Sequence, residues 1–351
     1  MGDLKRYSGL TTKVKAMRSR LVSNDEYLRL IECDKISEIA EFLKGKGGFD
    51  KALEKEDLSN IHRETLEHAI LYSGYNAYEK LYKFAGMEQR RYLKLYFMTY
   101  EIEIIKKALR KSGTTYISKG LMDMIREVFS KRSKVNYGAL FRASDFGDIV
   151  AALEGSIYYE PIKKVYDYGS TNTFDYELAL DMFYFRHCWK KRRQQFGGKE
   201  LHVISDILGT ECDLLNLLWI YRAKKFYNMT RSEVAAMVIP IYKRVKREQI
   251  AKLIETNDTG ELIAEIGKTF YGRYLTAERF EHMQIDKVSR AIVTKVYDKY
   301  YRTEPYSLAV MSSYMRAKRI EMNNLITIVE CVRYSYPKDT IAKSIVSEKI
   351  V

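Results

Sequence analysis

Two short patterns recur three times along this chain of 351 residues, always in the same order. The first is an apolar pair followed, eight residues after its first member, by an acid, which is Glu38, Asp148 and Glu261 in the three copies. Further apolar residues stand one and five positions after that acid. The second pattern starts at an acid 63, 65 and 60 residues farther on, at Glu101, Asp213 and Glu321.

The period of this repeat, about 110 residues, is too long for an α-solenoid, whose units span about 30 to 50 residues. It matches the size of an ordinary small domain. We therefore expect three related units, with approximate boundaries, at residues 1–113, 114–228 and 229–351.

The second pattern has helical geometry. Positions one, four and eight after the acid are apolar in all three copies: Ile102, Ile105 and Leu109, then Leu214, Leu217 and Tyr221, then Met322, Leu325 and Val329. At 100° per residue these positions fall within about 60° of arc, which predicts one buried stripe with the acid at its edge. From there the acid can meet a donor on a neighbouring helix.

The polar positions around the stripe are repeated less faithfully. Asn216 and Asn324 follow their acids by three residues, where the first copy has Ile104. Arg110 and Arg222 follow by nine residues and point to the opposite face, where the third copy has Glu330. The residues with a predicted polar role are therefore Glu101, Asp213, Asn216, Glu321 and Asn324.

The chain as a whole is expected to be all-α. It has only 4 Pro, which break helix interiors, and no region alternates with period two between hairpin turns. Ser23 with Glu26, and Thr230 with Glu233, have the spacing of helix-capping pairs. A long helix is expected from Ser73 to Leu109, with interruptions at Gly74 and Gly86.

Sequence patterns of known reactive sites are missing. The chain has no phosphate-binding loop of the G-x-x-x-x-G-K-[ST] type, no dinucleotide fingerprint and no nucleophile elbow. Its 4 Cys and 5 His do not stand at metal-ligand spacing. We predict no catalytic residue, cofactor or metal, and hence a chain that is not an enzyme by itself.

Charge and hydropathy bear on partners. The net charge of +14 favours anionic partners, and 29 Tyr raise the alternative of a basic helical repeat protein that binds nucleic acid or acts as a scaffold. The repeats argue against a nucleic-acid partner, because acids rather than basic clusters recur in them.

No apolar run approaches the 18 residues of a bilayer span, so membrane contact is expected to be peripheral or through partners.

The N-terminal run from Tyr7 to Ser23 has an aromatic start and a basic-Val-basic-Ala-Met pattern, and an acidic-Tyr segment, Asp25-Glu26-Tyr27, follows it. This run resembles the opening of the C subunits of the archaeal and bacterial A/V-type ATPases, a family that includes the d subunit of the eukaryotic V-ATPase. The acid-x-x-Asn-Leu motifs at Asp213 and Glu321 resemble the long-helix signature of that family, and the resemblance covers essentially the whole chain.

The resemblance implies three helical bundles around a pseudo-threefold axis, arranged as a funnel. It implies a peripheral subunit at the cytoplasmic face of the membrane, between the proteolipid rotor ring and the central-stalk subunits of the D/F type, with no nucleic acid. The membrane stator subunit is a further candidate partner. Such a socket links ATP hydrolysis or synthesis to proton or sodium transport. Glu101, Asp213, Asn216, Glu321 and Asn324 would then contact the stalk, or alternatively tie each unit to the next.

Overall fold

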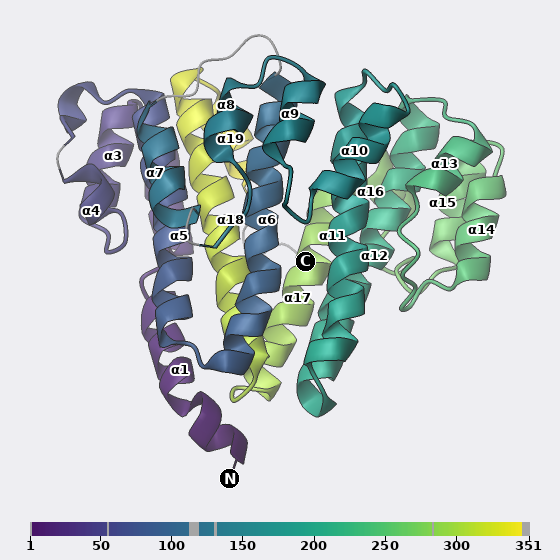
Figure 1. Ribbon diagram of the computed structural model, residues 1–351, viewed down its shortest axis with the longest axis horizontal. Helices are drawn as coiled ribbons and strands as arrows, with labels where there is room; N and C mark the ends of the chain where they lie inside the picture. The colour runs from purple at the N-terminus through teal and green to yellow at the C-terminus, as the bar shows by residue number, and fades with distance from the viewer. Residues whose placement is uncertain (1, 55, 112–118, 130–131, 283, 346–351) are drawn as a thin grey trace. The chain divides into compact units, whose positions relative to one another are not determined.

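The computed structural model describes residues 2–54, 56–111, 119–129, 132–282 and 284–345. These residues form helices and connecting loops, without a strand among them, as the all-α prediction requires (Figure 1). No helix in the described part of the chain combines the length and the apolar character that a membrane span needs. The first predicted unit boundary, between residues 113 and 114, lies outside the described residues.

The chain forms two compact units. One contains the described residues up to Leu180 and those from Val310 onward, and the other contains Asp181–Ala309. The helices of the first unit are α1 (Gly2–Arg18), α2 (Asn24–Ile31), α3 (Ile36–Lys44), α4 (Asp50–Leu53), the 3₁₀ turn η1 (Leu58–Asn60), α5 (Arg63–Phe84), α6 (Met87–Lys111), α7 (Lys119–Phe129), α8 (Tyr137–Arg142), α9 (Phe146–Ala152), α10 (Tyr159–Asp167) and α19 (Lys338–Ser344). The helices of the second unit are α12 (Gly198–Phe226), α13 (Arg231–Met237), α14 (Arg247–Glu255), α15 (Thr259–Gly267), α16 (Ala277–Glu281) and α17 (Ile285–Thr303).

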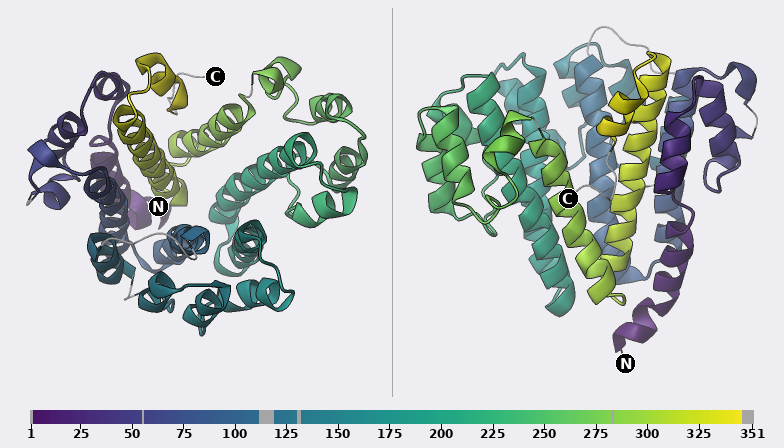
Figure 2. Two further views of the ribbon diagram at one scale, coloured as in Figure 1. Left: turned by 90° about the horizontal axis from the view of Figure 1, so that it is seen from above. Right: turned by 180° about the vertical axis from the view of Figure 1, so that it is seen from behind.

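Two long helices pass from one unit to the other, α11 (Thr173–Gln195) and α18 (Leu308–Arg333). In the first unit α5, α6 and α18 lie side by side, as Figures 1 and 2 show. The Tyr96 hydroxyl of α6 donates to the Met315 carbonyl of α18 at 3.1 Å. The short helices gather at one end of the long ones within each unit (Figure 1).

One core joins the two ends of the chain. Buried side chains of α2 and α3, including Leu30, Ile39 and Leu43, pack with Leu325 and Val329 of α18. Apolar contacts between segments so far apart in sequence fix α18 against the N-terminal helices, because burying their side chains is favourable only when both are present. This core therefore draws on the first and third predicted repeats, whose boundaries stay predictions.

The predicted helix signals differ in their outcomes. Ser23 and Thr230 form the reciprocal capping boxes that their spacing predicts. The interruption at Gly86 is confirmed, since α5 ends at Phe84 and α6 begins at Met87. The interruption at Gly74 is wrong: α5 runs through it. A Cβ at Gly74 would lie 2.1 Å from the Met322 sulfur, so glycine serves there to let α18 approach.

Tyrosines contribute much of the packing. Tyr75 and Tyr100 meet edge to face with ring centroids 4.9 Å apart, and Phe129 meets Tyr75 in the same way at 4.9 Å. Five tyrosines belong to the most deeply buried large side chains: Tyr7, Tyr78, Tyr158, Tyr176 and Tyr271. Buried rings cannot stack on nucleic-acid bases, so the abundance of tyrosine gives little support to the nucleic-acid alternative.

Candidate functional site

The repeated acids of the second pattern lie on α6, α12 and α18 and are almost fully buried. Glu101 is 7 % exposed, Asp213 1 % and Glu321 2 %. Burying a carboxylate is costly unless hydrogen-bond donors satisfy it. The donors that each acid receives therefore show what each does in the fold.

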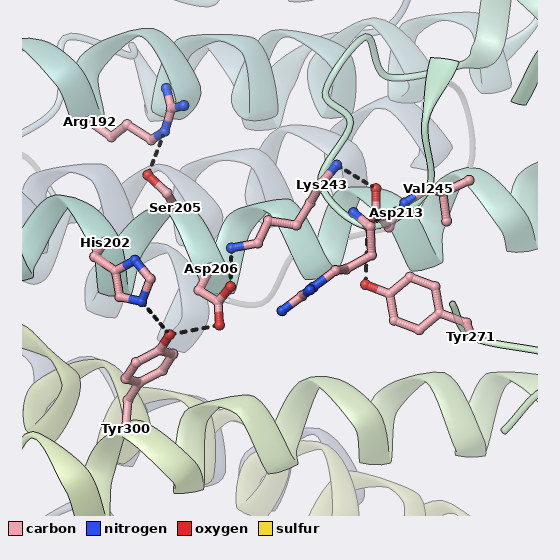
Figure 3. A network of polar contacts seen from close by, with 10 residues as sticks. Arg192, His202, Ser205, Asp206, Asp213, Lys243, Val245, Tyr271 and Tyr300 are labelled. Atoms are coloured by element: carbon pink, nitrogen blue, oxygen red, sulfur yellow. Dashed lines mark hydrogen bonds and ion pairs between the residues drawn. The ribbon is translucent and has the colours of Figure 1, made fainter. Parts of the chain in front are cut away.

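Asp213 binds a loop that leads into a helix. It accepts hydrogen bonds from the backbone N–H groups of Lys243 at 3.0 Å, Arg244 at 2.6 Å and Val245 at 3.2 Å. The Tyr271 hydroxyl donates to the same carboxylate at 3.2 Å (Figure 3). Burial raises the pKa of Asp213 above its ordinary value even though these donors act to lower it. Four donors on one buried carboxylate make a latch that holds the loop against α12.

Glu101 makes the matching contact in the first unit. The Tyr158 hydroxyl donates to it at 2.7 Å and the Tyr137 hydroxyl at 3.4 Å. Burial raises the pKa of Glu101, while donation from Ser133, Tyr158 and Tyr137 opposes the rise. Tyr158 follows its first-pattern acid by the same number of residues as Tyr271 follows Glu261. A tyrosine at the same position of the repeat thus donates to the buried acid in two copies.

Glu321 makes the third contact with a different set of donors. It accepts a hydrogen bond from the Val22 backbone N–H at 2.7 Å and forms an ion pair with Lys318, one turn earlier on α18. Lys318 is only 5 % exposed, and its ammonium group lies 4.5 Å from the ring centroid of Phe49. Phe49 stands close to the place that Tyr158 and Tyr271 have in the other copies.

The donors to the three acids come from equivalent places in the chain. Val22 and Val245 each directly precede the residue that caps a short helix, α2 and α14, and Ser133 and Tyr137 flank the residue that caps α8. In terms of the predicted repeats, each acid binds the repeat that follows it, and the third binds the first. We call this recurring contact of a long-helix acid with the next short-helix segment the acid latch.

The first-pattern acids also recur in one structural role. The backbone N–H four residues earlier donates to Glu38 at 2.8 Å, to Asp148 at 2.9 Å and to Glu261 at 2.7 Å. Each acid stands in the first turn of its helix, α3, α9 or α15, where a negative charge is favourable. These acids therefore define the starts of three equivalent short helices.

The position nine residues after the latch acid carries an ion pair in each copy. Arg110 donates to Glu177 at 2.6 and 2.8 Å, and Arg222 donates to Asp286 at 2.7 and 2.8 Å. Glu330, which departs from the arginine pattern, is paired with Arg63. Asp286 and Arg63 lie in the first turns of α17 and α5, and Glu177 is the fifth residue of α11. The ion pair is thus kept in the third copy with its charges exchanged.

The two predicted asparagines differ in their contacts. Asn216 is 1 % exposed and makes two hydrogen bonds with the backbone of Ile239, accepting from its N–H at 2.8 Å and donating to its carbonyl at 2.9 Å. Asn324 is 2 % exposed and hydrogen-bonds the Tyr27 side chain on α2. Each asparagine therefore hydrogen-bonds the same short-helix segment as the latch acid three residues before it.

A second polar network lies two helical turns before Asp213 and has no counterpart among the described residues of the other copies. Asp206 forms an ion pair with Lys243 and accepts from the Tyr300 hydroxyl at 2.7 Å, and Tyr300 also meets His202 at 3.1 Å (Figure 3). Burial would raise the pKa of Asp206, but Lys243 and Tyr300 outweigh it and lower that pKa. The repeat pattern gives no sign of this network, because it belongs to one copy.

These arrangements hold helices and present no reactive group. Within the described residues no cluster of His, Cys, Asp or Glu has the geometry to hold a metal ion. The four cysteines are free, and burial raises the pKa of the Cys188 thiol to about 12, far from a reactive thiolate. The carboxylate oxygens of the latch acids accept hydrogen bonds from groups of the fold itself. The role of these acids is therefore to hold segments of the chain together.

Comparison with known proteins gives one consistent result. The family described as ATP synthase (C/AC39) subunit matches residues 10–344. The chain is 22 % identical over 339 residues to the C subunit of the A-type ATP synthase from Methanosphaera stadtmanae, covering 94 % of this chain and 84 % of the relative. It is 21 % identical over 349 residues to the C subunit of the A-type ATP synthase from Archaeoglobus fulgidus, covering 98 % and 97 %.

Proposed function

Since the chain belongs to the ATP synthase (C/AC39) subunit family, and is thereby a subunit of a rotary ATPase, we propose that it is the socket between the central stalk and the proteolipid ring. In this role it has no catalysis of its own. It transmits torque, so that ATP hydrolysis or synthesis in other subunits is linked to transport of protons or sodium ions. It sits peripherally, at the cytoplasmic face of the membrane.

The observation that carries this proposal is the acid latch. A socket that transmits torque must not shear between its parts, and its helices must keep their register under load. Buried carboxylates with several donors give directional restraint that apolar packing alone lacks. Three such latches, at Glu101, Asp213 and Glu321, would fasten each long helix to the following short-helix segment.

The proposed arrangement is three related bundles around a pseudo-threefold axis. The pattern of latches supports it: the acid of the first repeat binds the second, that of the second binds the third, and that of the third binds the first. A closed cycle of equivalent contacts is what three units around an axis require. The same pattern favours a role between units, rather than toward the stalk, for Glu101, Asp213, Asn216, Glu321 and Asn324.

The proposed partners are the D/F-type stalk subunits on one side and the proteolipid ring on the other, with the membrane stator subunit as a further candidate. The relatives from Methanosphaera stadtmanae and Archaeoglobus fulgidus are C subunits of A-type ATP synthases, which supports partners from the same kind of assembly. The net charge of +14 suits acidic partner surfaces.

Removal and restoration of the chain in the intact complex tests this function. Membrane vesicles that contain the complex without this chain would be assayed for ATP hydrolysis and, in parallel, for uptake of protons and of sodium ions. We expect hydrolysis to persist while ion uptake is lost, and added chain to restore uptake. Undiminished ATP-driven ion uptake in its absence would overturn the socket role.

A further inference from the structure

We propose that a basic pocket in the first compact unit binds a compact oxyanion, namely a phosphate group. This inference goes beyond the socket function and does not depend on it. The pocket has a volume of about 100 Å³ and is formed by α1, α5, α18 and the loop after α3. Its lining residues are Lys13, Met17, Arg20, Leu21, Gly47, Gly48, Ser73, Asn76, Ala77, Lys80, Tyr314 and Lys318.

The charge of the lining is strongly one-sided. It contains four cations and no acid. The charge of Lys318 is balanced by Glu321 behind it, but Lys13, Arg20 and Lys80 form no ion pair within the described part of the chain. Lys13 is half-buried and Arg20 and Lys80 are exposed, so water screens part of their mutual repulsion, and a bound anion would relieve the rest.

Neutral donors face the same cavity. Tyr314 lines the cavity, and no hydrogen-bond partner for its hydroxyl exists among the described residues. The side-chain amide of Asn76, which is half-buried, likewise has no partner in the described structure. The Tyr314 hydroxyl is therefore available to donate to an oxygen of a ligand in the cavity.

The loop leaves room for these side chains. Gly48 has φ of +126°, a conformation that side chains rarely adopt, and a Cβ at Gly47 would lie 3.8 Å from Arg20 Cδ. Gly47 thus lies beside the Arg20 side chain, and Gly48 keeps a backbone conformation that favours glycine. Arginine and lysine side chains around one cavity can present several N–H donors to one tetrahedral oxyanion.

The size of the pocket selects among anions. A volume of about 100 Å³ is that of a small cavity. Pockets for whole cofactors and drug-sized ligands span about 300 to 1,000 Å³. The cavity therefore fits a phosphate group but not an enclosed nucleotide. That group could be free phosphate or the end of a phosphomonoester whose organic part lies outside.

Titration calorimetry of the full chain tests the site, with inorganic phosphate as the first probe and glycerol phosphate as the second, at constant ionic strength set with chloride. We expect saturable binding of phosphate, with sulfate as a competitor. The variant Lys13→Gln/Lys80→Gln should weaken binding by about tenfold or more, since it removes two charge-assisted contacts. Tyr314→Phe should weaken it by about threefold through loss of one neutral donor.

Lys83→Gln is the matched control, because Lys83 is an exposed lysine of α5 outside the pocket lining. It should bind phosphate as the unaltered chain does, and circular dichroism should show the same helix content for all variants. Tighter binding of glycerol phosphate than of phosphate would identify an ester as the source, and the reverse order would identify the free ion. Absence of saturable binding, or equal weakening by Lys83→Gln, would overturn the proposal.

Discussion

Lys318 lies over the ring of Phe49, with its ammonium nitrogen 4.5 Å from the ring centroid, while it is paired with Glu321. In the other two copies of the repeat a tyrosine reaches the latch acid through its hydroxyl, Tyr158 to Glu101 and Tyr271 to Asp213. Phe49 has no hydroxyl to donate, and Lys318 supplies the missing donor from α18 itself. The hydroxyl donor that Phe49 lacks is thus replaced by the ammonium group of Lys318, which is far away in sequence.

Glu321→Gln should strongly destabilise the chain, because Lys318 would remain buried with an uncompensated charge. Removal of one partner of a buried ion pair costs about 3 to 5 kcal/mol. The double variant Lys318→Met/Glu321→Gln should recover part of that loss. Urea unfolding followed by circular dichroism measures the stability of both variants. Equal stability of Glu321→Gln and the double variant would show that the charge of Lys318 is not the cause of the loss.

Conversion of the first copy to the pattern of the others gives a second test. Phe49→Tyr in a Lys318→Met background adds a hydroxyl to the ring over which the lysine nitrogen lay. We expect it to regain about 1 kcal/mol relative to Lys318→Met alone, the usual net value of a hydrogen bond. In the unaltered background, where Lys318 already occupies the acid, Phe49→Tyr should bring no gain. A gain of the same size in both backgrounds would contradict the proposed compensation.

Asp213→Ala should unfold the second unit at lower urea concentration than the unaltered chain. It leaves the N–H groups of Lys243, Arg244 and Val245 without their acceptor, at a cost of about 1 to 3 kcal/mol for each group that water cannot reach. Both tryptophans, Trp189 and Trp219, lie in this unit, so their fluorescence reports its unfolding.

Asp213→Asn, which keeps one acceptor oxygen, should fall between Asp213→Ala and the unaltered chain. The control is Glu265→Gln, which removes only an ion pair with an exposed lysine, Lys268, and should cost less than about 1 kcal/mol. If Asp213→Ala lost no more stability than this control, the hydrogen bonds of Asp213 would not stabilise the fold.

Stability should fall as the pH rises from about 4.5 to about 6 because of Glu67. Burial and the neighbouring Glu330 raise the pKa of Glu67 to about 6, although Arg63 and Lys107 oppose the rise. A carboxyl with a higher pKa in the folded than in the unfolded chain binds more protons when folded. Its stabilising contribution is therefore complete below its unfolded pKa and is lost as the pH passes its folded pKa.

Glu67→Gln should flatten that part of the pH dependence, measured as thermal unfolding temperature between pH 4 and 7. Glu54→Gln, which changes an exposed acid of the same compact unit, is the control and should leave the slope in place. An unchanged slope in Glu67→Gln would assign the pH dependence to other groups.

Much of the fold could be predicted from the sequence, because the apolar stripe and the capping residues are local signals. The stripe positions Ile105, Leu217 and Leu325 are all buried. That the acid at the edge of the stripe would meet a donor from another segment also follows from helix geometry. The partners themselves could not be predicted, because Val22 and Glu321 are brought together only by the shared core of the two chain ends.

The departures from the repeat could not be interpreted from sequence alone. Glu330 breaks the arginine pattern, yet it keeps the ion pair because Arg63 replaces the acid of the other copies. Such exchanges preserve an interaction while changing both residues, so a comparison of single positions between copies scores them as differences. The role of Asp206 could not be predicted for a related reason, since its network belongs to one copy.

Isolation of the tagged chain from its native membranes at low and moderate salt, with mass spectrometry of the proteins that accompany it, tests the central claim most directly. The socket function predicts recovery of central-stalk subunits, catalytic-head subunits and the proteolipid at both salt concentrations. Recovery of nucleic acid or ribosomal proteins, without any subunit of a rotary ATPase, would contradict it and favour the basic helical repeat alternative.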